Sequence, residues 1–161
     1  MTSLFTSGTI RILVCNRQGK KCLQYPIFRI MIRKWRLYQY VSPAGRRAID
    51  DWRKSLPIGP PRADMDTFLR DMVKRDLWEP PDLEPLRGTL HGLTELRWKS
   101  GKLPHRIFGY QPGDHEYLML IGCTHRETYD PPGALETVLV RRRQIQDHEA
   151  SIDEYRLILN R

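Results

Sequence analysis

LTELRWKSGKLPHRIFGY, residues Leu93–Tyr110, predicts two β-strands joined by a short turn. Strict alternation in its first half places the charged side chains of Glu95, Arg97 and Lys99 on one face, with Trp98 and its apolar neighbours on the other. The apolar face can pack on a hydrophobic core. The charged face is mainly positive, so it either binds a phosphodiester chain or is simply a solvated face of a sheet.

The second half of this stretch adds an imidazole and aromatic rings. The turn is assigned to Ser100-Gly101, because glycine adopts the positive φ that a tight connection often needs. Arg106 then shares its parity with Phe108 and Tyr110, while His105 has the opposite parity. Cations and aromatic rings on adjacent strands suit nucleic-acid binding, because guanidinium groups hold phosphates and rings stack on bases.

The segments on either side of these strands indicate an α+β fold. Runs of helices followed by runs of strands are typical of helices packed against a largely antiparallel sheet. We therefore expect a small antiparallel sheet with two N-terminal helices packed on one face and a C-terminal helix. The expected elements are a strand at 34–41, a helix between Ser42-Pro43 and Pro57, a helix at 63–78, short and buried strands at 86–90 and 117–123, a helix at 133–149, and a short final helix opened by a Ser151–Glu154 capping box.

Length and pattern predict one domain with extensions in a chain of 161 residues. The domain pattern begins clearly only near Lys34, and Met31 is an alternative start. We expect an N-terminal extension of uncertain order at 1–30, the main domain at 31–149, and a short C-terminal helix or tail at 150–161.

Charge and cysteine content narrow the class of protein. The formal net charge of +8 favours acidic partners, with nucleic acid ahead of an acidic protein or an anionic membrane. Cys15, Cys22 and Cys123 contain no CxxC pair, which argues against a disulfide framework or a zinc site and favours a reducing cytoplasm. No apolar run approaches the roughly 20 residues that a membrane span requires, so we expect no membrane partner.

Four short motifs, taken in their order and spacing, resemble a known family. They are Glu95-Leu96-Arg97, Arg106-Ile107-Phe108, Leu118-Met119-Leu120-Ile121-Gly122 and Arg141-Arg142-Arg143-Gln144-Ile145. Together with the strand-helix-helix-sheet plan, they are similar to the RelE/ParE toxin superfamily, in its HigB-like, phage-derived branch of toxin–antitoxin toxins. The resemblance covers about residues 34–148.

The resemblance implies a compact, microbial RNase-like fold and a cytoplasmic, growth-arresting toxin of a type II toxin–antitoxin system. It implies a metal-independent, cofactor-free mRNA interferase, which is a ribosome-associated endoribonuclease that uses the 2′-hydroxyl of the RNA as nucleophile. The implied partners are mRNA, the ribosome and an acidic, helix-turn-helix antitoxin. The alternatives are a ParE-like inhibitor of DNA gyrase and a decayed toxin that retains only antitoxin binding.

The resemblance also points to site residues. Arg97 and Arg106 match the arginines that face the active groove in this branch, and guanidinium groups suit the charge of a phosphorane. The branch usually has a lysine pair after the buried strand, where this chain has His125-Arg126. His125 can take either proton role near neutrality, and Tyr129 can donate a proton or stack.

The candidate catalytic residues are thus Arg97, Arg106, His125 and Tyr129, and the candidate RNA-binding residues are Lys99, Tyr110 and Arg126. In the competing interpretation the two arginines are ordinary ion-pair residues, with Glu95 as a near partner.

Overall fold

The computed structural model describes residues 11–15, 22–26, 34–125 and 127–157. The chain divides into two compact units, Met1–Ile32 and Arg33–Arg161. In the first unit, β1 (Arg11–Cys15) and β2 (Cys22–Pro26) pair antiparallel. The alternative start at Met31 and the adjoining boundary lie outside the described residues.

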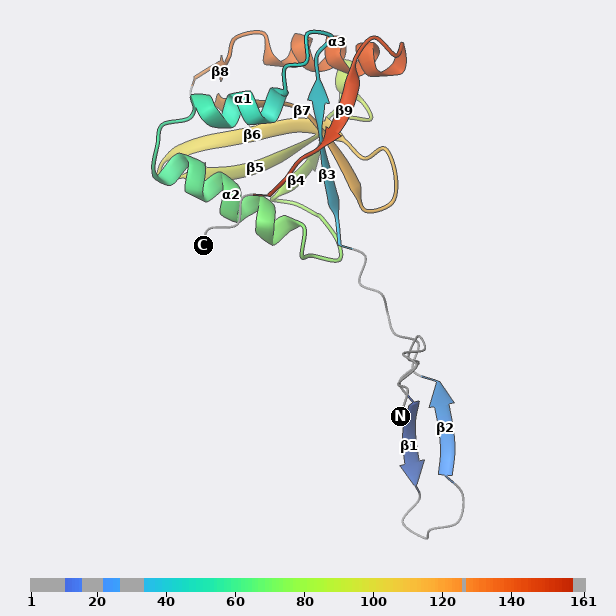
Figure 1. The fold of residues 1–161 in the computed structure, drawn as a ribbon. Helices are drawn as coiled ribbons and strands as arrows, with labels where there is room; N and C mark the ends of the chain where they lie inside the picture. The colour runs from blue at the N-terminus through green and yellow to red at the C-terminus, as the bar shows by residue number, and fades with distance from the viewer. Residues whose placement is uncertain (1–10, 16–21, 27–33, 126, 158–161) are drawn as a thin grey trace, which may run out of the picture. The chain divides into compact units, whose positions relative to one another are not determined.

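The second unit is built on a mixed sheet (Figure 1). Its strands are β3 (Arg36–Val41), β4 (Leu83–Pro85), β5 (Thr94–Ser100), β6 (Leu103–Tyr110), β7 (Glu116–His125), β8 (Tyr129–Asp130) and β9 (Ser151–Glu154). They follow the order β4-β5-β6-β7-β3-β9, with β8 paired to β7. β7, the most apolar strand, therefore lies inside the sheet, as the sequence predicts.

The α+β class is confirmed, but the sheet is not purely antiparallel. β3 runs parallel to β7, whereas the other described pairings of this sheet are antiparallel. Sequence alternation shows which side chains share a face and is silent on strand direction, so this pairing was not anticipated. The helices are α1 (Ala48–Ser55), α2 (Pro60–Met72) and α3 (Ala134–Gln146), with a short 3₁₀ helix, η1 (Gly88–Leu90).

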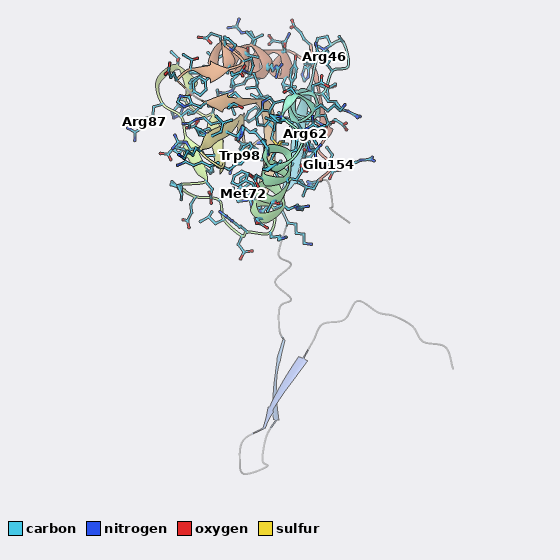
Figure 2. All side chains as sticks on the ribbon, turned by 90° about the vertical axis from the view of Figure 1, so that its left-hand side faces the viewer. Arg46, Arg62, Met72, Arg87, Trp98 and Glu154 are labelled. Carbon is cyan, nitrogen blue, oxygen red and sulfur yellow. The ribbon has the colours of Figure 1, made fainter. Side chains whose placement is uncertain are left out.

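Helices cover both faces of the sheet, and each face has its own hydrophobic cluster. Ile49 of α1 and Met65 of α2 join Trp98 and Ile107 in the first cluster. Trp98 is 8% exposed, which confirms its predicted place in the core (Figure 2). The second cluster lies under α3, whose contributions to it include the buried residues Ala134 and Val138; Phe108, Leu118 and Leu120 come from the sheet.

A β-bulge interrupts the pairing of β6 with β7. Phe108 pairs with Ile121 and Gly109 pairs with Met119, so Leu120 is an extra residue on β7. The bulge places Leu120 and Ile121 in the same cluster under α3, although they are adjacent in sequence. It also moves the following residues by one position in the alternation, which directs Gly122 toward α1.

Two predicted helices and one predicted strand differ from the structure. The helix expected at 63–78 is α2, which starts at Pro60, where proline is favoured, and ends at Met72. The chain then folds back, and Trp78 donates its indole N–H to the Met72 carbonyl at 2.8 Å. The short strand expected at 86–90 is displaced to β4, with η1 at its former place.

The predicted final helix is wrong, because Ser151–Glu154 forms β9. This strand pairs antiparallel with β3, and the chain continues to Tyr155, whose N–H donates to the Leu37 carbonyl at 2.8 Å. The local capping pattern is thus overridden by pairing with the outer edge of β3, which satisfies backbone groups that an isolated short helix would leave open. Beyond residue 157 the chain lies outside the described residues.

Candidate functional site

Arg97 and Arg106 occupy directly opposite positions on β5 and β6, and both point to one carboxylate. The Nη1 atom of Arg106 donates to Oε2 of Glu95 at 2.9 Å, and Nε of Arg97 donates to Oε1 of the same residue at 2.7 Å. A second Arg97 nitrogen, Nη2, also donates to Oε1. The side chain of Glu95 is only 3% exposed, so this carboxylate is buried and held by two cations.

A second carboxylate extends the cluster to the edge of the sheet. Glu84 of β4 pairs in register with Glu95, and its Oε2 accepts a hydrogen bond from Nη1 of Arg97 at 3.2 Å. Arg97 therefore bridges two glutamates that would otherwise repel each other across adjacent strands. We call Glu84, Glu95, Arg97 and Arg106 the arginine–glutamate cluster. With all four groups ionised it carries no net charge.

The two arginines retain unequal capacity to bind a further group. The Arg97 side chain is 39% exposed and remains reachable from solvent, whereas that of Arg106 is 18% exposed. The Nε atom of Arg106 is buried and has no hydrogen-bond partner among the residues that the structure describes. Buried donors are almost always paired, so this N–H indicates an acceptor still to be supplied. A phosphate oxygen reaching Arg106 would satisfy it.

His125 is the last residue of β7, one position past the end of its pairing with β6, and Tyr129 follows in β8. Strand β8 folds back on β7, so that Tyr129 pairs with His125 and their ring centroids are 4.8 Å apart. The Tyr129 ring also meets the edge of Phe108, with 5.6 Å between ring centroids. Burial raises the pKa of Tyr129, and the positive charge of Arg106 opposes that rise. Tyr129 therefore lies within the electrostatic field of the arginine–glutamate cluster and stays protonated at neutral pH.

The predicted RNA-binding residues are placed differently. Lys99 is exposed on the same strand as Arg97. Tyr110 is the last residue of β6, and Arg142 of α3 lies over its ring at 5.7 Å from the centroid. Parity assigns a residue to a face without fixing its place along the strand, which is why Tyr110 does not join Arg106. Arg126 lies outside the described residues.

The sequence did not indicate two residues of this site, which are Glu84 in the cluster and Cys123 beside Arg106. Glu84 lies between the helix expected at 63–78 and the strand expected at 86–90, and no local pattern marks it as a strand residue facing Arg97. Cys123 pairs in register with Arg106, and burial raises the pKa of its thiol to about 12. This cysteine is therefore a protonated, apolar wall of the site. The alternation of Glu95 with Arg97 was the signal available for the shared carboxylate.

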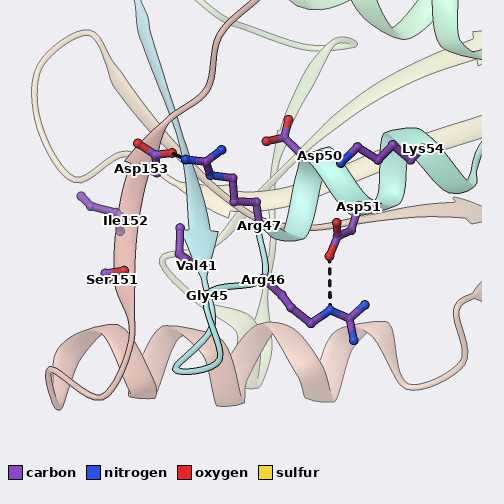
Figure 3. A pocket seen from close by; sticks show the side chains of 10 residues that line it. All are labelled: Val41, Gly45, Arg46, Arg47, Asp50, Asp51, Lys54, Ser151, Ile152 and Asp153. Atoms are coloured by element: carbon purple, nitrogen blue, oxygen red, sulfur yellow. Dashed lines mark hydrogen bonds and ion pairs between the residues drawn. The ribbon is translucent and has the colours of Figure 1, made fainter.

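Another hollow in the fold has no comparable chemistry. A cavity of about 910 Å³ between α1 and β9 is lined mainly by charged side chains (Figure 3). Two ion pairs neutralise much of its lining, Arg46 with Asp51 at 3.3 Å and Arg47 with Asp153 at 2.8 Å (Figure 3). The second pair joins the N-cap residue of α1 to β9, whereas the first lies between α1 and the turn before it.

Across residues 11–15, 22–26, 34–125 and 127–157, His, Cys, Asp and Glu form no group of three or more suited to a metal ion. Nor does any helix in these ranges have the length and apolar content needed to cross a membrane. Comparison of the chain with known protein families, curated proteins and solved structures found no match. The arginine–glutamate cluster, flanked by His125 and Tyr129, is therefore the candidate functional site.

Proposed function

We propose that this protein is the toxin of a type II toxin–antitoxin system, related to the HigB-like branch of the RelE/ParE superfamily, and that it cleaves mRNA on the ribosome without a metal ion. The observation that carries the proposal is the placement of Arg97 and Arg106 opposite each other, with Tyr129 and His125 beside them. The strand-helix-helix-sheet order of the second unit supports it.

Each group has a role in cleavage by the 2′-hydroxyl of RNA. The 2′-oxygen attacks the adjacent phosphorus, the bond from phosphorus to the 5′-oxygen breaks, and a 2′,3′-cyclic phosphate forms. Arg97 and Arg106 stabilise the added charge on the non-bridging oxygens, a contribution of roughly 3–4 kcal/mol for one well-placed donor. His125 and Tyr129 are placed to accept the 2′-hydroxyl proton and to protonate the leaving 5′-oxygen, and one such group contributes ~10²–10⁴ in rate.

Glu95 prepares the two arginines for this role. Its buried carboxylate fixes both guanidinium groups before substrate arrives, so little reorganisation is needed in the transition state. The Nε donor of Arg106 is left for the phosphate. The site therefore has a preorganised pair of cations whose own charges are balanced by protein.

The net charge of +8 supports partners of opposite charge. We propose that these are mRNA, the ribosome and an acidic helix-turn-helix antitoxin in the cytoplasm. An acidic antitoxin would hold the toxin inactive by covering Arg97 and Arg106. Co-expression with the neighbouring gene product and co-purification tests this part of the proposal.

A second candidate function rests on the charge balance of the same cluster. Both arginines are already engaged by carboxylates, which favours a protein that binds without cutting. That protein would be a ParE-like gyrase inhibitor or a decayed toxin that keeps only its antitoxin. Gyrase-linked DNA breaks with intact messages would identify the first, and complex formation without growth arrest would identify the second.

The experiment is induction of the protein alone, followed by growth measurement and primer extension on translated messages. We expect growth arrest and cut messages with the wild type, and neither with Arg97→Ala or Arg106→Ala. The matched control is Arg75→Ala, which removes the partly exposed guanidinium that pairs with Asp82 at 2.5 Å. Circular dichroism checks that each variant is folded. Intact messages during arrest would contradict the nuclease.

His125→Ala and Tyr129→Phe then separate the two proton roles. The group that acts as general acid or base should lower the single-turnover cleavage rate by ~10²–10⁴ when removed. Tyr129→Phe keeps the ring contacts with Phe108 and His125, so its effect reports on the hydroxyl alone.

A further inference from the structure

A cavity of about 760 Å³ lies where the central strand β7 has no strand beside it. β3 pairs with β7 only as far as Met119, and β8 begins to pair at Thr124. Within the described part of the chain, the residues between these two positions have no ladder partner on that side. The cavity is lined from both faces of the sheet, by Trp52, His105 and Thr124 toward α1 and by Tyr40, Ile121 and Arg141 toward α3.

His105 brings an unused hydrogen-bonding atom to this cavity. The residue is 1% exposed, and its Nδ1 lies 3.1 Å from the Thr124 hydroxyl oxygen. Its Nε2 is buried, and no group in the described part of the chain hydrogen-bonds it. Nε2 donates in one tautomer and accepts in the other, and the Thr124 hydroxyl can serve either. An orphaned polar atom in an otherwise well-packed ring environment indicates a missing partner.

The walls around His105 are aromatic. The His105 ring stacks on Trp98, with ring centroids 5.5 Å apart and planes inclined by 23°, and meets Trp52 at 6.2 Å in an edge arrangement. Trp52 reaches this position because Gly122 has no side chain, since a Cβ there would lie 1.9 Å from the indole ring. A glycine in the central strand thus admits an indole beside the imidazole that carries the orphaned Nε2.

The charges at the cavity are balanced. Arg46 and Arg141 line it together with Asp51 and Asp130. Arg141 is further held by its 2.6 Å hydrogen bond to the Leu120 carbonyl. Burial lowers the pKa of His105, which keeps the imidazole neutral at neutral pH. A balanced lining with a neutral, aromatic interior fits an uncharged planar heterocycle better than a phosphate or another compact ion.

The cavity adjoins the proposed nuclease site through consecutive residues. His105 lines the cavity, and the next residue, Arg106, belongs to the arginine–glutamate cluster. Thr124 and Asp130 line the cavity, whereas His125 and Tyr129 flank the cluster. The alternation of three neighbouring strands therefore presents one set of side chains to each place. A single-stranded nucleic acid that passes this end of the sheet can engage both.

We infer that this cavity binds a nucleobase of the RNA whose backbone the arginine–glutamate cluster holds, an inference that rests on the proposed function. His105 Nε2 hydrogen-bonds the edge of the base, and Trp52 provides an aromatic wall beside it. A base bound here would be adjacent to the scissile phosphate and would contribute sequence preference to cleavage. Stacking and edge hydrogen bonds are the means by which proteins distinguish bases in single-stranded RNA.

The test uses the four nucleoside 5′-monophosphates AMP, GMP, CMP and UMP as probes of the full-length protein. With ¹⁵N-histidine label, long-range ¹H–¹⁵N spectra observe Nε2 of His105, which is assigned by its loss in His105→Phe. At least one monophosphate should shift this resonance saturably. Saturation-transfer NMR should show that His105→Phe weakens the binding of that monophosphate about ten-fold or more, as expected for a lost hydrogen bond in a buried site.

Matched variants keep the result clear of folding defects. Thr124→Val preserves the shape of the side chain and removes the hydroxyl beside Nδ1 of His105. It should weaken monophosphate binding several-fold, and it serves as the test if His105→Phe does not fold. His91→Phe, at an exposed histidine on the loop before β5, should leave binding unchanged. Arg75→Ala, which removes the guanidinium that pairs with Asp82, should leave monophosphate binding within two-fold of wild type.

The outcomes separate this inference from the proposed function. RNA cleavage without any monophosphate effect on His105 overturns the cavity's role and leaves the nuclease standing. Monophosphate binding that requires His105, in a protein that cuts no RNA, establishes the nucleobase site and overturns the nuclease. Equal binding by wild type and by both His105→Phe and Thr124→Val also overturns the cavity's role.

Discussion

Arg97 and Arg106 face each other across β5 and β6 and are held by a single buried carboxylate. Like charges directly opposite each other on adjacent strands are destabilising. The arrangement is stable because the negative carboxylate of Glu95 contacts both guanidinium groups. The same residue is therefore central to stability and, on the proposed function, to phosphate binding.

Replacing Glu95 by glutamine should destabilise the fold. The change leaves two guanidinium groups without their shared counter-ion, and loss of one partner from a buried pair costs about 3–5 kcal/mol, reduced here to about 2–3 kcal/mol because Arg97 is partly exposed. Urea denaturation measures the free energy of unfolding of each variant and of the wild type. Glu116→Gln is the control, since its partner Arg36 is 61% exposed and the pair should contribute less than about 1 kcal/mol.

A double variant checks the cause. Adding Arg97→Gln to Glu95→Gln should recover part of the lost stability, because the uncompensated positive charge is reduced. If Glu95→Gln is no more harmful than Glu116→Gln, the shared carboxylate does not hold the cluster together.

Gly122→Ala should be strongly destabilising, because its Cβ would lie 1.9 Å from the Trp52 ring. Overpacking of this kind costs typically about 1–3 kcal/mol, and an indole fixed between a helix and a strand is at the upper end. Thermal and urea unfolding report the change. Gly113→Ala is the control, since there the contact at 2.9 Å is with the end of the flexible Glu116 side chain.

The same substitution made in a Trp52→Leu background should cost markedly less. Equal costs in the two backgrounds would show that the clash is relieved elsewhere. The comparison also shows how much of the cavity wall depends on the indole.

The ion pair between α1 and α2 should matter far more than an exposed one. Arg53 donates to both oxygens of Asp66 at 2.7 and 2.6 Å, and the Asp66 side chain is 4% exposed. Asp66→Ala should cost about 3–5 kcal/mol, because it strands a mostly buried guanidinium. Asp71→Ala, which removes an exposed partner of Lys74, should cost less than about 0.5 kcal/mol. Similar losses for both would contradict the role assigned to burial.

Stability should fall as the pH drops below neutrality, partly through His105. Burial lowers the folded-state pKa of His105 below its ordinary value of 6.5, and Asp64 opposes that shift. The unfolded chain therefore binds the proton first, so the stabilisation is full above about pH 6.5 and is lost as the pH falls through the folded-state pKa.

Urea unfolding between pH 7 and 5 tests this, with His105→Gln as the variant that lacks the titrating ring. We expect the wild type to lose more stability over that range than His105→Gln. Parallel pH profiles would show that other groups carry the whole dependence.

Part of this fold follows from local pattern. Alternation placed Trp98 in the core and Glu95 with Arg97 on the other face, because side-chain direction is fixed by the strand itself. The apolar run of β7 indicated an interior strand, because a strand buried on both faces carries apolar side chains on both.

Features that depend on pairing with residues distant in the sequence could not be predicted from local pattern. Ser151–Glu154 has the local pattern of a helix start and becomes a strand because β3 offers it an edge. Glu84 joins the site through strand pairing that its own neighbours in sequence do not signal. The Leu120 bulge likewise belongs to the pairing of β6 with β7 and is not signalled by the sequence of either strand.

The parallel pairing of β3 with β7 has a consequence for the order of folding. Arg36 and Glu116, which pair in register, are 80 residues apart in sequence. By contrast, β5 and β6 are joined directly through the Gly101-Lys102 turn, so that hairpin closes at small entropic cost. During synthesis β3 and the helices after it leave the ribosome long before their partner strand exists. In the nascent chain β3 therefore stays unpaired with β7 until β7 has been synthesised, and only then can this part of the sheet form.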